Sequence, residues 1–509
     1  MAIEPTTVAP APPGEGRHAA LAPAAMGLGG VIFILLAGAA PLYAMLFNVP
    51  LTVMGGGYAG PAAFVVATVA LLVFSVGYIR MAQRVRSAGG FYSFVTAGLG
   101  KVMGLGSAYV ISVCYLVFCA AIIGPTAYFT HGSLQHWFDI DVPAWLLLFV
   151  ILAISSLLAY FRVGLTARVL SVLMCLELLG LAVFVVAILA HGGGPEGLSL
   201  RPLNPLALFG NSEAVSVFGA AAVGVALFGA FWSWVGFEMA PNYAEESRDP
   251  ARVARLAMYG SVIGLGIIYT VVAFCFVNGW GVTGVAEAVK AQFDGQYDSA
   301  FYPLTDHFGT LALTEYFRVL TITSGFAAQL AFYNTAARYL FSLGRERVLP
   351  GWLAGTHPRH GSPHRASLVV TVVVAAYMLC FVLADSSDAA ALTKLGTWSP
   401  LLGVLGLLAI QALVCVAIIR YFRVKAPEAF SPWATLIAPV LGALAMVGAV
   451  VVLLINRTTL SGAGDAMFVR ALPWVIAGLF VIGVVTATVF RQRAPQRYAA
   501  IGSFTSFHD

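Results

Sequence analysis

The sequence predicts an all-α polytopic membrane protein that crosses the bilayer about twelve times. Of its 509 residues, 60% are hydrophobic and only 10% are charged, whereas soluble domains carry about 25% charged residues. The hydrophobic residues lie in runs of roughly 20, which is the length that an α-helix needs to cross a hydrocarbon core of about 30 Å. Two of these runs are interrupted near their middle, and the interruptions indicate a binding site inside the membrane.

The apolar runs define twelve predicted spans. They are 27–48, 60–82, 104–129, 143–161, 166–190, 216–240, 256–278, 316–342, 366–384, 395–420, 436–455 and 471–490. Residues 1–25 are rich in alanine and proline and lack the basic and apolar regions of a signal peptide, so we expect a disordered cytoplasmic tail there.

Lysine and arginine predict the orientation of these spans. On the side of the N-terminus, loops and tails hold 21 of the 27 basic residues, and the opposite loops hold five. Basic residues gather on the cytoplasmic side of membrane proteins, so we expect a multi-pass protein of the cytoplasmic membrane with both termini inside. The net charge of +5 therefore reflects topology and does not indicate a nucleic-acid partner. The longest outer connection, 279–315, contains an amphipathic segment, Val285–Phe293, that is either a lid or a surface helix.

The first interruption, Gly38-Ala39-Ala40-Pro41, lies in the first span. Proline lacks an N–H group and clashes with the preceding turn, so we expect the helix to break and restart near Pro41. A restarted helix has free N–H groups at its positive end, which can bind a carboxylate without a charged side chain. The small side chains beside the break leave room for a ligand. The alternative is a proline kink in a packed helix.

The second interruption lies in the sixth span and runs from Phe231 through Trp232, Ser233, Trp234 and Gly236 to Glu238. We expect the outer half of this span to end near Phe231 with free carbonyl groups, which suit an ammonium group. The face of Trp232 would cover a bound ligand and exclude water, although packing between helices is the alternative for each aromatic residue. Together the two breaks predict a site for a zwitterionic α-amino acid.

Two carboxyl groups lie inside predicted spans. An unpaired carboxylate in the membrane is costly and tends to stay protonated, so Glu177 is a candidate proton carrier or a partner for an amine. Its alternative is a neutral carboxyl between helices. Glu238 would cap the inner half-helix of the sixth span, a structural or gating role.

Hydroxyl and aromatic residues in other spans are further candidates. Thr323 and Ser324 in the eighth span could bind Na⁺ together with main-chain carbonyls, or could bond to their own helix. Tyr115 in the third span and Trp398 in the tenth could face the site in gating roles, or could simply pack.

Several classes of chemistry have no support in the sequence. All six cysteines lie in apolar spans, and no histidine pair within a span has metal-ligand spacing, so we expect no disulfide, no metal and no cofactor beyond a coupling ion. No glycine-rich loop precedes a Lys-Ser/Thr pair, which disfavours a bound nucleotide as the energy source. No catalytic cluster indicates an enzyme.

Short motifs on the predicted cytoplasmic loops resemble the amino acid–polyamine–organocation superfamily, in its bacterial amino acid permease branch. They are Ala88-Gly89-Gly90-Phe91-Tyr92, Gly236-Phe237-Glu238 with the following 244–250 segment, and Ala337 to Glu346 followed by Leu349-Pro350 and Gly361-Ser362-Pro363. The resemblance covers most of residues 26–425. It implies a five-plus-five inverted repeat of 26–190 and 214–420, with 436–490 peripheral and 491–509 a cytoplasmic tail.

The resemblance also implies secondary active transport of an amino acid across the lipid bilayer by alternating access. Trp232 and Ser233 match positions at which a relative carries its substrate-capping Trp and a neighbouring Ser. Proton-coupled relatives can carry a lysine where this chain has Glu177, and many have a glycine-rich run where it has Ala39-Ala40-Pro41. We expect proton-coupled symport; the alternatives are Na⁺ coupling, exchange, or a polyamine or amine substrate.

Overall fold

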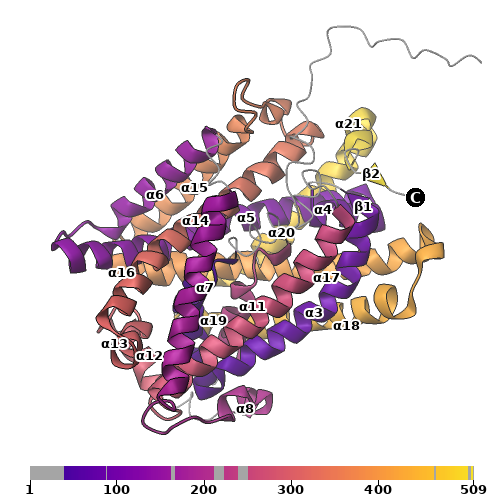
Figure 1. The fold of residues 1–509 in the computed structure, drawn as a ribbon. Coiled ribbons are helices and arrows are strands. Elements are labelled where there is room, and N and C mark those ends of the chain that lie inside the picture. The colour runs from indigo at the N-terminus through magenta and orange to yellow at the C-terminus, as the bar shows by residue number, and fades with distance from the viewer. Residues whose placement is uncertain are drawn as a thin grey trace, which may run out of the picture.

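The computed structural model is a bundle of helices packed around two interrupted segments (Figure 1). It describes residues 39–86, 89–161, 167–210, 223–238, 250–462, 466–502 and 506–507. The predicted tail 1–25, Gly38 and the end of the sixth predicted span lie outside the described residues.

Long helices form the body of the bundle. They are α3 (Gly60–Arg84), α5 (Lys101–Phe138), α6 (Ala144–Tyr160), α7 (Ala167–Ala190), α11 (Pro250–Trp280), α14 (Leu311–Arg345), α15 (His364–Ala384), α17 (Ser399–Val424), α18 (Ala438–Ile455) and α20 (Met467–Arg493). Two π-helical segments, η5 (Ala391–Trp398) and η7 (Pro432–Ile437), lead into α17 and α18.

Shorter elements lie at the breaks and in the connections. They are α2 (Pro41–Gly56), α4 (Phe91–Leu99), α8 (Pro205–Gly210), α10 (Val223–Ser233), α12 (Val285–Phe293), α13 (Phe301–Phe308), α16 (Asp388–Ala390), α19 (Arg457–Ser461), α21 (Pro495–Ala500), the 3₁₀ turns η1 (Gly57–Ala59), η2 (Arg201–Leu203), η4 (Gly351–Ala354) and η6 (Pro427–Ala429), and the strands β1 (Val85–Arg86) and β2 (Ser506–Phe507). The predicted amphipathic segment forms α12 and packs against α2 through buried residues such as Val285 and Val289.

In the described part of the chain, eight helical segments are long and apolar enough to cross a membrane. They are Pro41–Arg84, Lys101–Phe138, Val172–Ala190, Met258–Trp280, His364–Ala384, Asp388–Val424, Pro432–Ile455 and Met467–Arg493. The fold is therefore that of a polytopic helical membrane protein, as predicted. Each of the twelve predicted ranges overlaps a helix, but the number of crossings stays a prediction.

The difference between eight and twelve has a physical reason. The segment Pro41–Arg84 contains α2, η1 and α3, which belong to two predicted spans, while α6 and α10 are shorter apolar helices. Helix α14 is long but carries buried polar side chains, including Thr321, Ser324 and Gln329. These polar residues lower the mean hydropathy of α14. The helix can carry them because it lies inside the bundle, against α5, α2 and α7.

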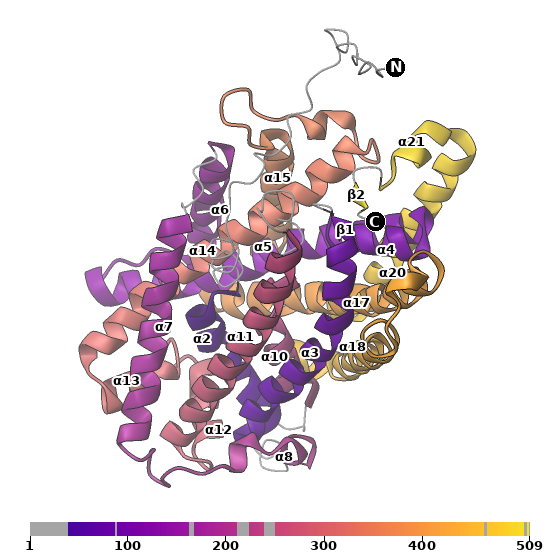
Figure 2. The ribbon, with the colours of Figure 1, turned by 45° about the vertical axis from the view of Figure 1, so that its right-hand side comes forward.

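The interrupted segments α2 and α10 lie side by side near the centre, among α3, α5, α11 and α14 (Figure 2). Their main chains approach closely at Gly229, where an added Cβ atom would lie 3.0 Å from the Asn48 carbonyl oxygen. This close packing brings the two predicted breaks, far apart in sequence, to one place.

The C-terminal residues bind to one end of the bundle, where β1, β2, α4 and α21 gather; α8 and α12 lie at the opposite end (Figure 1). The Lys101 ammonium donates to the carbonyls of Tyr498 (3.1 Å) and Ala499 (2.6 Å). The Gly502 N–H donates to the Tyr92 hydroxyl oxygen at 2.9 Å, and that hydroxyl donates to Glu346. Ile501 is fully buried in a small apolar cluster with Tyr92. These contacts join the end of the chain to α4, α5 and the end of α14.

We expect Ile501→Ala to loosen this C-terminal anchor. Removing a buried isoleucine side chain costs about 2–5 kcal/mol, so α21 should open more often and trypsin should cleave after Arg497 at least tenfold faster, as followed by mass spectrometry. Ile455→Ala is the matched control, because Ile455 is 71% exposed. Equal cleavage rates in the two variants would show that Ile501 does not hold the segment.

Candidate functional site

The first break is a left-handed turn at Ala40. Its φ is 41° and its ψ is 67°, and α2 begins at the next residue, Pro41. A left-handed conformation costs a non-glycine residue about 1–2 kcal/mol, so the surrounding structure must hold this turn in place. The residues that adopt it are the small ones on which the sequence prediction rested.

The first turn of α2 binds a carboxyl group of the protein itself. The Leu42 N–H donates to Glu177 Oε2 on α7 at 3.2 Å. Glu177 is 3% exposed, and the buried hydroxyl of Ser324 on α14 interacts with its carboxyl group. The sequence treated the first break and Glu177 as separate features, whereas in the structure one is the partner of the other. A carboxylate at this position satisfies an unpaired N–H and offsets the positive end of the helix.

The second break follows Ser233, where α10 ends. The N–H groups of Trp234 and Val235 donate back to the carbonyls of Phe231 and Trp232, both at 3.2 Å. Gly236 then turns the chain with a φ of 116°, which side chains disfavour. The carbonyls that the sequence predicted to be free are thus partly used by this tight turn, although each retains a second lone pair.

Glu238 closes the same turn. Its carboxyl oxygens accept the Gly236 N–H at 3.0 Å and the Tyr115 hydroxyl at 2.8 Å, and its carbonyl accepts the Tyr78 hydroxyl at 3.1 Å. The residues after Glu238 lie outside the described part of the chain, so its predicted role as a cap of the next half-helix remains a prediction. Tyr115, a predicted gating residue, contacts the break through Glu238.

Tyr269 on α11 joins the two breaks. Its hydroxyl donates to the Ser233 carbonyl at 3.0 Å and lies 3.4 Å from the Ala39 carbonyl oxygen. The ring is fully buried between Phe64 and Trp234. One hydroxyl therefore lies within reach of a carbonyl group from each interrupted segment.

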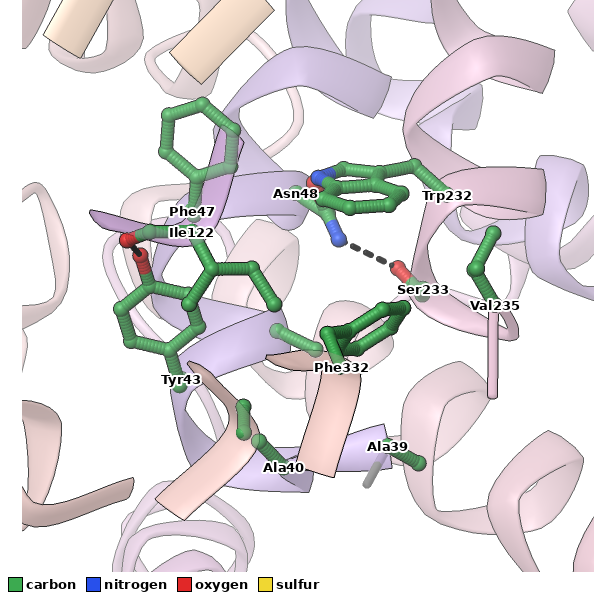
Figure 3. A pocket seen from close by; sticks show the side chains of 12 residues that line it. Ala39, Ala40, Tyr43, Phe47, Asn48, Ile122, Trp232, Ser233, Val235 and Phe332 are labelled. Atoms are coloured by element: carbon green, nitrogen blue, oxygen red, sulfur yellow. Dashed lines mark hydrogen bonds between the residues drawn. The ribbon is translucent and has the colours of Figure 1, made fainter. Parts of the chain in front are cut away.

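A small pocket lies between the breaks and the first half of α2 (Figure 3). Its lining is mostly apolar and comes from α2, α5, α10 and α14 and from the residues at the two breaks: Ala39, Ala40, Tyr43, Ala44, Phe47, Asn48, Ile122, Trp232, Ser233, Val235, Ala328 and Phe332. The cavity has a volume of about 30 Å³, which holds one or two water molecules. No charged side chain is among these lining residues.

Trp232 covers one side of this pocket. Its ring stacks on Phe118, with centroids 4.9 Å apart and an interplanar angle of 25°, and it lies 6.3 Å from Phe332. Figure 3 shows Trp232 and Phe47 at one end of the pocket and Ala39 and Ala40 at the other. A flat apolar face held in this way can exclude water from a ligand in the pocket.

The remaining predicted site residues fall into two groups. Pro41 and Gly236 shape the main chain but do not line the pocket, and Phe231 and Trp234 line a separate cavity of about 10 Å³ that Val235 also borders. Trp234 lies 5.1 Å from Tyr269, centroid to centroid, so its ring belongs to the packing behind the break.

The predicted ion-binding and gating residues are dispersed. The Thr323 hydroxyl lies 3.2–3.3 Å from the carbonyls of Val319 and Leu320 in its own helix, whereas Ser324 faces Glu177. Trp398 stacks on Phe468 and donates to the Ser461 carbonyl at 2.8 Å. It is not among the residues that line the pocket.

Several residues at the site were not identified from the sequence. They are Tyr43, Ala44, Phe47, Asn48, Phe118, Ile122, Tyr269, Ala328 and Phe332. A signal existed for Asn48 and Tyr269, because each is a polar group in a predominantly apolar predicted span. The others are apolar residues in apolar helices, which sequence patterns do not distinguish from ordinary packing.

Comparisons with known proteins match this chain to amino acid transporters. A family model described as amino acid permease matches residues 25–489, which include both breaks and the pocket. The branched-chain amino acid permease BcaP of Bacillus subtilis (strain 168) is 25% identical over 453 residues, covering 85% of this chain and 87% of that protein. The chloroplastic cationic amino acid transporter 7 of Arabidopsis thaliana is 25% identical over 406 residues, covering 74% and 62%. The glutamate/serine transporter AimA of Bacillus subtilis (strain 168) is 21% identical over 339 residues, covering 64% and 60%.

Replacing Tyr269 with Phe should loosen the second break while the ring stays packed. Loss of one buried hydrogen bond costs about 1 kcal/mol, and the amides of residues 231–236 should exchange with deuterium severalfold faster, as measured by mass spectrometry. Tyr316→Phe is the control, because that hydroxyl donates to the Leu176 carbonyl on α7 instead. Unchanged exchange at 231–236 in Tyr269→Phe would exclude this role.

Proposed function

Because the chain belongs to the amino acid permease family, we propose that it carries an amino acid across the cytoplasmic membrane by alternating access, coupled to protons. It is a transporter and not an enzyme. The observation that carries the finer proposal is the meeting of two main-chain breaks at one small pocket. Binding takes place beside Ala39 and Ala40 at one break and Trp232 and Ser233 at the other.

The two breaks supply opposite electrostatic poles. The start of α2 presents N–H groups and the positive end of a helix dipole, which stabilise a carboxylate. The end of α10 presents carbonyl oxygens, which stabilise an ammonium group. Since an α-amino acid carries both groups on one carbon, it satisfies both poles at once. A diamine has no carboxylate for α2 and would require acidic side chains, none of which is among the lining residues.

The small volume of the pocket supports alternating access. A space of about 30 Å³ is too small for an amino acid, so the lining must move apart to admit one. Helices α2 and α10, which lie in the proposed first and second repeats (26–190 and 214–420), move relative to the helices around them. The proposed architecture has twelve crossings, both termini in the cytoplasm, and 436–490 at the periphery.

Glu177 is the proposed proton site. When ionised, it accepts the Leu42 N–H and neutralises part of the positive end of α2. When a proton binds to it, the carboxyl loses its charge and holds this end of the helix less strongly. The helix then stabilises the carboxylate of the bound amino acid instead. Binding of the proton therefore increases the affinity for the substrate, and the reverse. Release of the proton on the opposite side of the membrane then lowers the affinity for the substrate. A sodium site is less well supported, because the Thr323 hydroxyl donates to a carbonyl of its own helix.

Uptake by purified protein in proteoliposomes tests the substrate class. We expect saturable uptake of a radiolabelled amino acid, faster with acid outside, that unlabelled amino acids inhibit and 1,4-diaminobutane does not. Trp232→Ala should raise the apparent KM about tenfold, because it removes a flat face over the ligand, while the variant still folds and gives a single cooperative melting transition, at a lower temperature because a buried ring is lost. Inhibition by the diamine alone would identify an amine transporter, and no flux at all would refute transport.

Glu177→Gln tests the coupling. Glutamine keeps the size of the carboxyl and imitates its protonated form, so the apparent KM should no longer depend on pH between about 5.5 and 7.5. Exchange of labelled for unlabelled substrate should persist, while accumulation driven by a pH gradient should fall at least tenfold. Glu196→Gln, which changes an exposed carboxyl on an outer connection, should behave like the wild type. A pH-dependent KM in Glu177→Gln would assign the proton to another group.

A further inference from the structure

Asn48 lines the pocket, and its Oδ1 is a buried hydrogen-bond acceptor that no described residue uses. We propose that Asn48 Oδ1 selects neutral amino acids whose side chain carries a hydroxyl or carboxamide donor, such as threonine, serine, asparagine and glutamine. This proposal rests on the proposed function, because it names the substrates of that same site. It concerns the side chain of the substrate, not its ammonium and carboxylate groups.

Asn48 belongs to the face of α2 that lines the pocket. Ala40, Tyr43, Ala44, Phe47 and Asn48 are spaced by three and four residues, so they follow one side of the helix. Asn48 lies seven residues beyond Pro41, about 10 Å further along the helix axis, and side chains on a helix tilt back toward its N-terminus. It therefore lies about two helical turns from the start of α2 and next to Ser233 at the end of α10 (Figure 3), within reach of the side chain of an amino acid bound at the start of α2.

The hydrogen bonds around Asn48 determine which way its amide faces. The Ser233 hydroxyl donates its proton to the Gly229 carbonyl at 2.8 Å, so its oxygen can only accept from a further partner. Asn48 Nδ2 is that partner, also at 2.8 Å. A flipped amide would set an oxygen against an oxygen that has no proton to offer. Oδ1 must therefore point away from Ser233.

This oxygen is buried and unpaired. Asn48 is 2% exposed and Oδ1 has no hydrogen-bond partner. The two hydroxyl groups that line the pocket are already engaged, since the Tyr43 hydroxyl donates to the Ile122 carbonyl at 2.9 Å and Ser233 is bonded as described. A buried acceptor needs a donor from water or from a ligand. An aliphatic side chain would expel the water and supply no donor, whereas a hydroxyl or carboxamide replaces it.

The same surroundings disfavour charged side chains. A lysine or arginine side chain would lose its hydration among Phe47, Trp232 and Phe332 with one neutral oxygen as its partner, which is a large cost without a carboxylate. The side-chain carboxylate of an aspartate or glutamate substrate would place a negative charge, in addition to its α-carboxylate, against the acceptor oxygen Asn48 Oδ1. Neutral polar side chains are the class that satisfies Oδ1 without burying a charge.

Two pairs of nearly isosteric substrates test the proposal in proteoliposomes: threonine with valine, and asparagine with leucine. In the wild type, we expect the polar member to have a kcat/KM at least tenfold higher, because a site with an unpaired acceptor rejects an analogue without the donor. In Asn48→Leu, which keeps the size and removes the acceptor, the ratio should fall to about one or reverse. Asn204→Leu, the same change at an exposed residue outside the pocket, should keep the wild-type ratio.

The outcomes separate this proposal from the proposed function. Transport of amino acids by the wild type with valine or leucine preferred would overturn the role of Asn48 and leave the transporter intact. An Asn48→Leu variant that is weakened equally for both members of each pair would show that Oδ1 binds the ammonium group or serves packing, which also overturns it. If Asn48→Leu does not fold, Asn48→Ala replaces it. Alanine also removes the acceptor and leaves no oxygen opposite Ser233, so the ratio should again fall to about one, and a ratio unchanged from the wild type would count against the proposal. Absence of all amino acid uptake would refute the proposed function itself.

Discussion

Main-chain polar groups without helical partners, held in an apolar interior, are the constraint on which this structure depends. Each such group costs free energy comparable to a lost hydrogen bond unless it finds a partner. At Ala40 and at Trp234–Gly236 side chains supply these partners. Glu177 and Tyr269 are distant in sequence from their partners Leu42 and Ser233, whereas Glu238 bonds to Gly236 within the same turn. These hydrogen bonds stabilise the interrupted main chain. Ala40 keeps its left-handed conformation because the surrounding structure fixes it there.

The partners differ in what they can exchange. Tyr269 and Tyr115 are hydrogen-bond donors between helices, to Ser233 and Glu238 respectively. Glu177 is a carboxyl whose charge can change, and it contacts the same half-helix that would bind a substrate carboxylate. A single hydrogen bond at the start of α2 thus gives the proposed transport cycle a means of sensing a proton at the place where the substrate binds.

The pocket combines an apolar wall with few polar atoms, and most of these are already paired. This arrangement allows main-chain poles to bind what all amino acids share and one side chain, Asn48, to respond to what differs between them. Far from the pocket, the C-terminal residues bind across α4, α5 and the end of α14. Residues 498–502 are therefore part of the folded body, and the predicted cytoplasmic location of the tail 491–509 stays a prediction.

The sequence by itself determined the properties that arise from neighbours along the chain. Run length and hydropathy predicted the helices and the membrane class. The missing N–H of Pro41 predicted the first break, and the aromatic-rich segment from Phe231 to Glu238 was predicted to hold the second. Helix α14 was predicted as a span despite its polar residues, because the apolar run continues around them. Only the tertiary structure decided which groups meet. The Leu42–Glu177 bond joins residues 135 apart and the Asn48–Ser233 bond joins residues 185 apart, and Trp232 lines the pocket while Trp234, two residues on, packs behind it. Local rules cannot predict such pairings, because they depend on how whole helices pack and on which way a tight turn rotates each side chain.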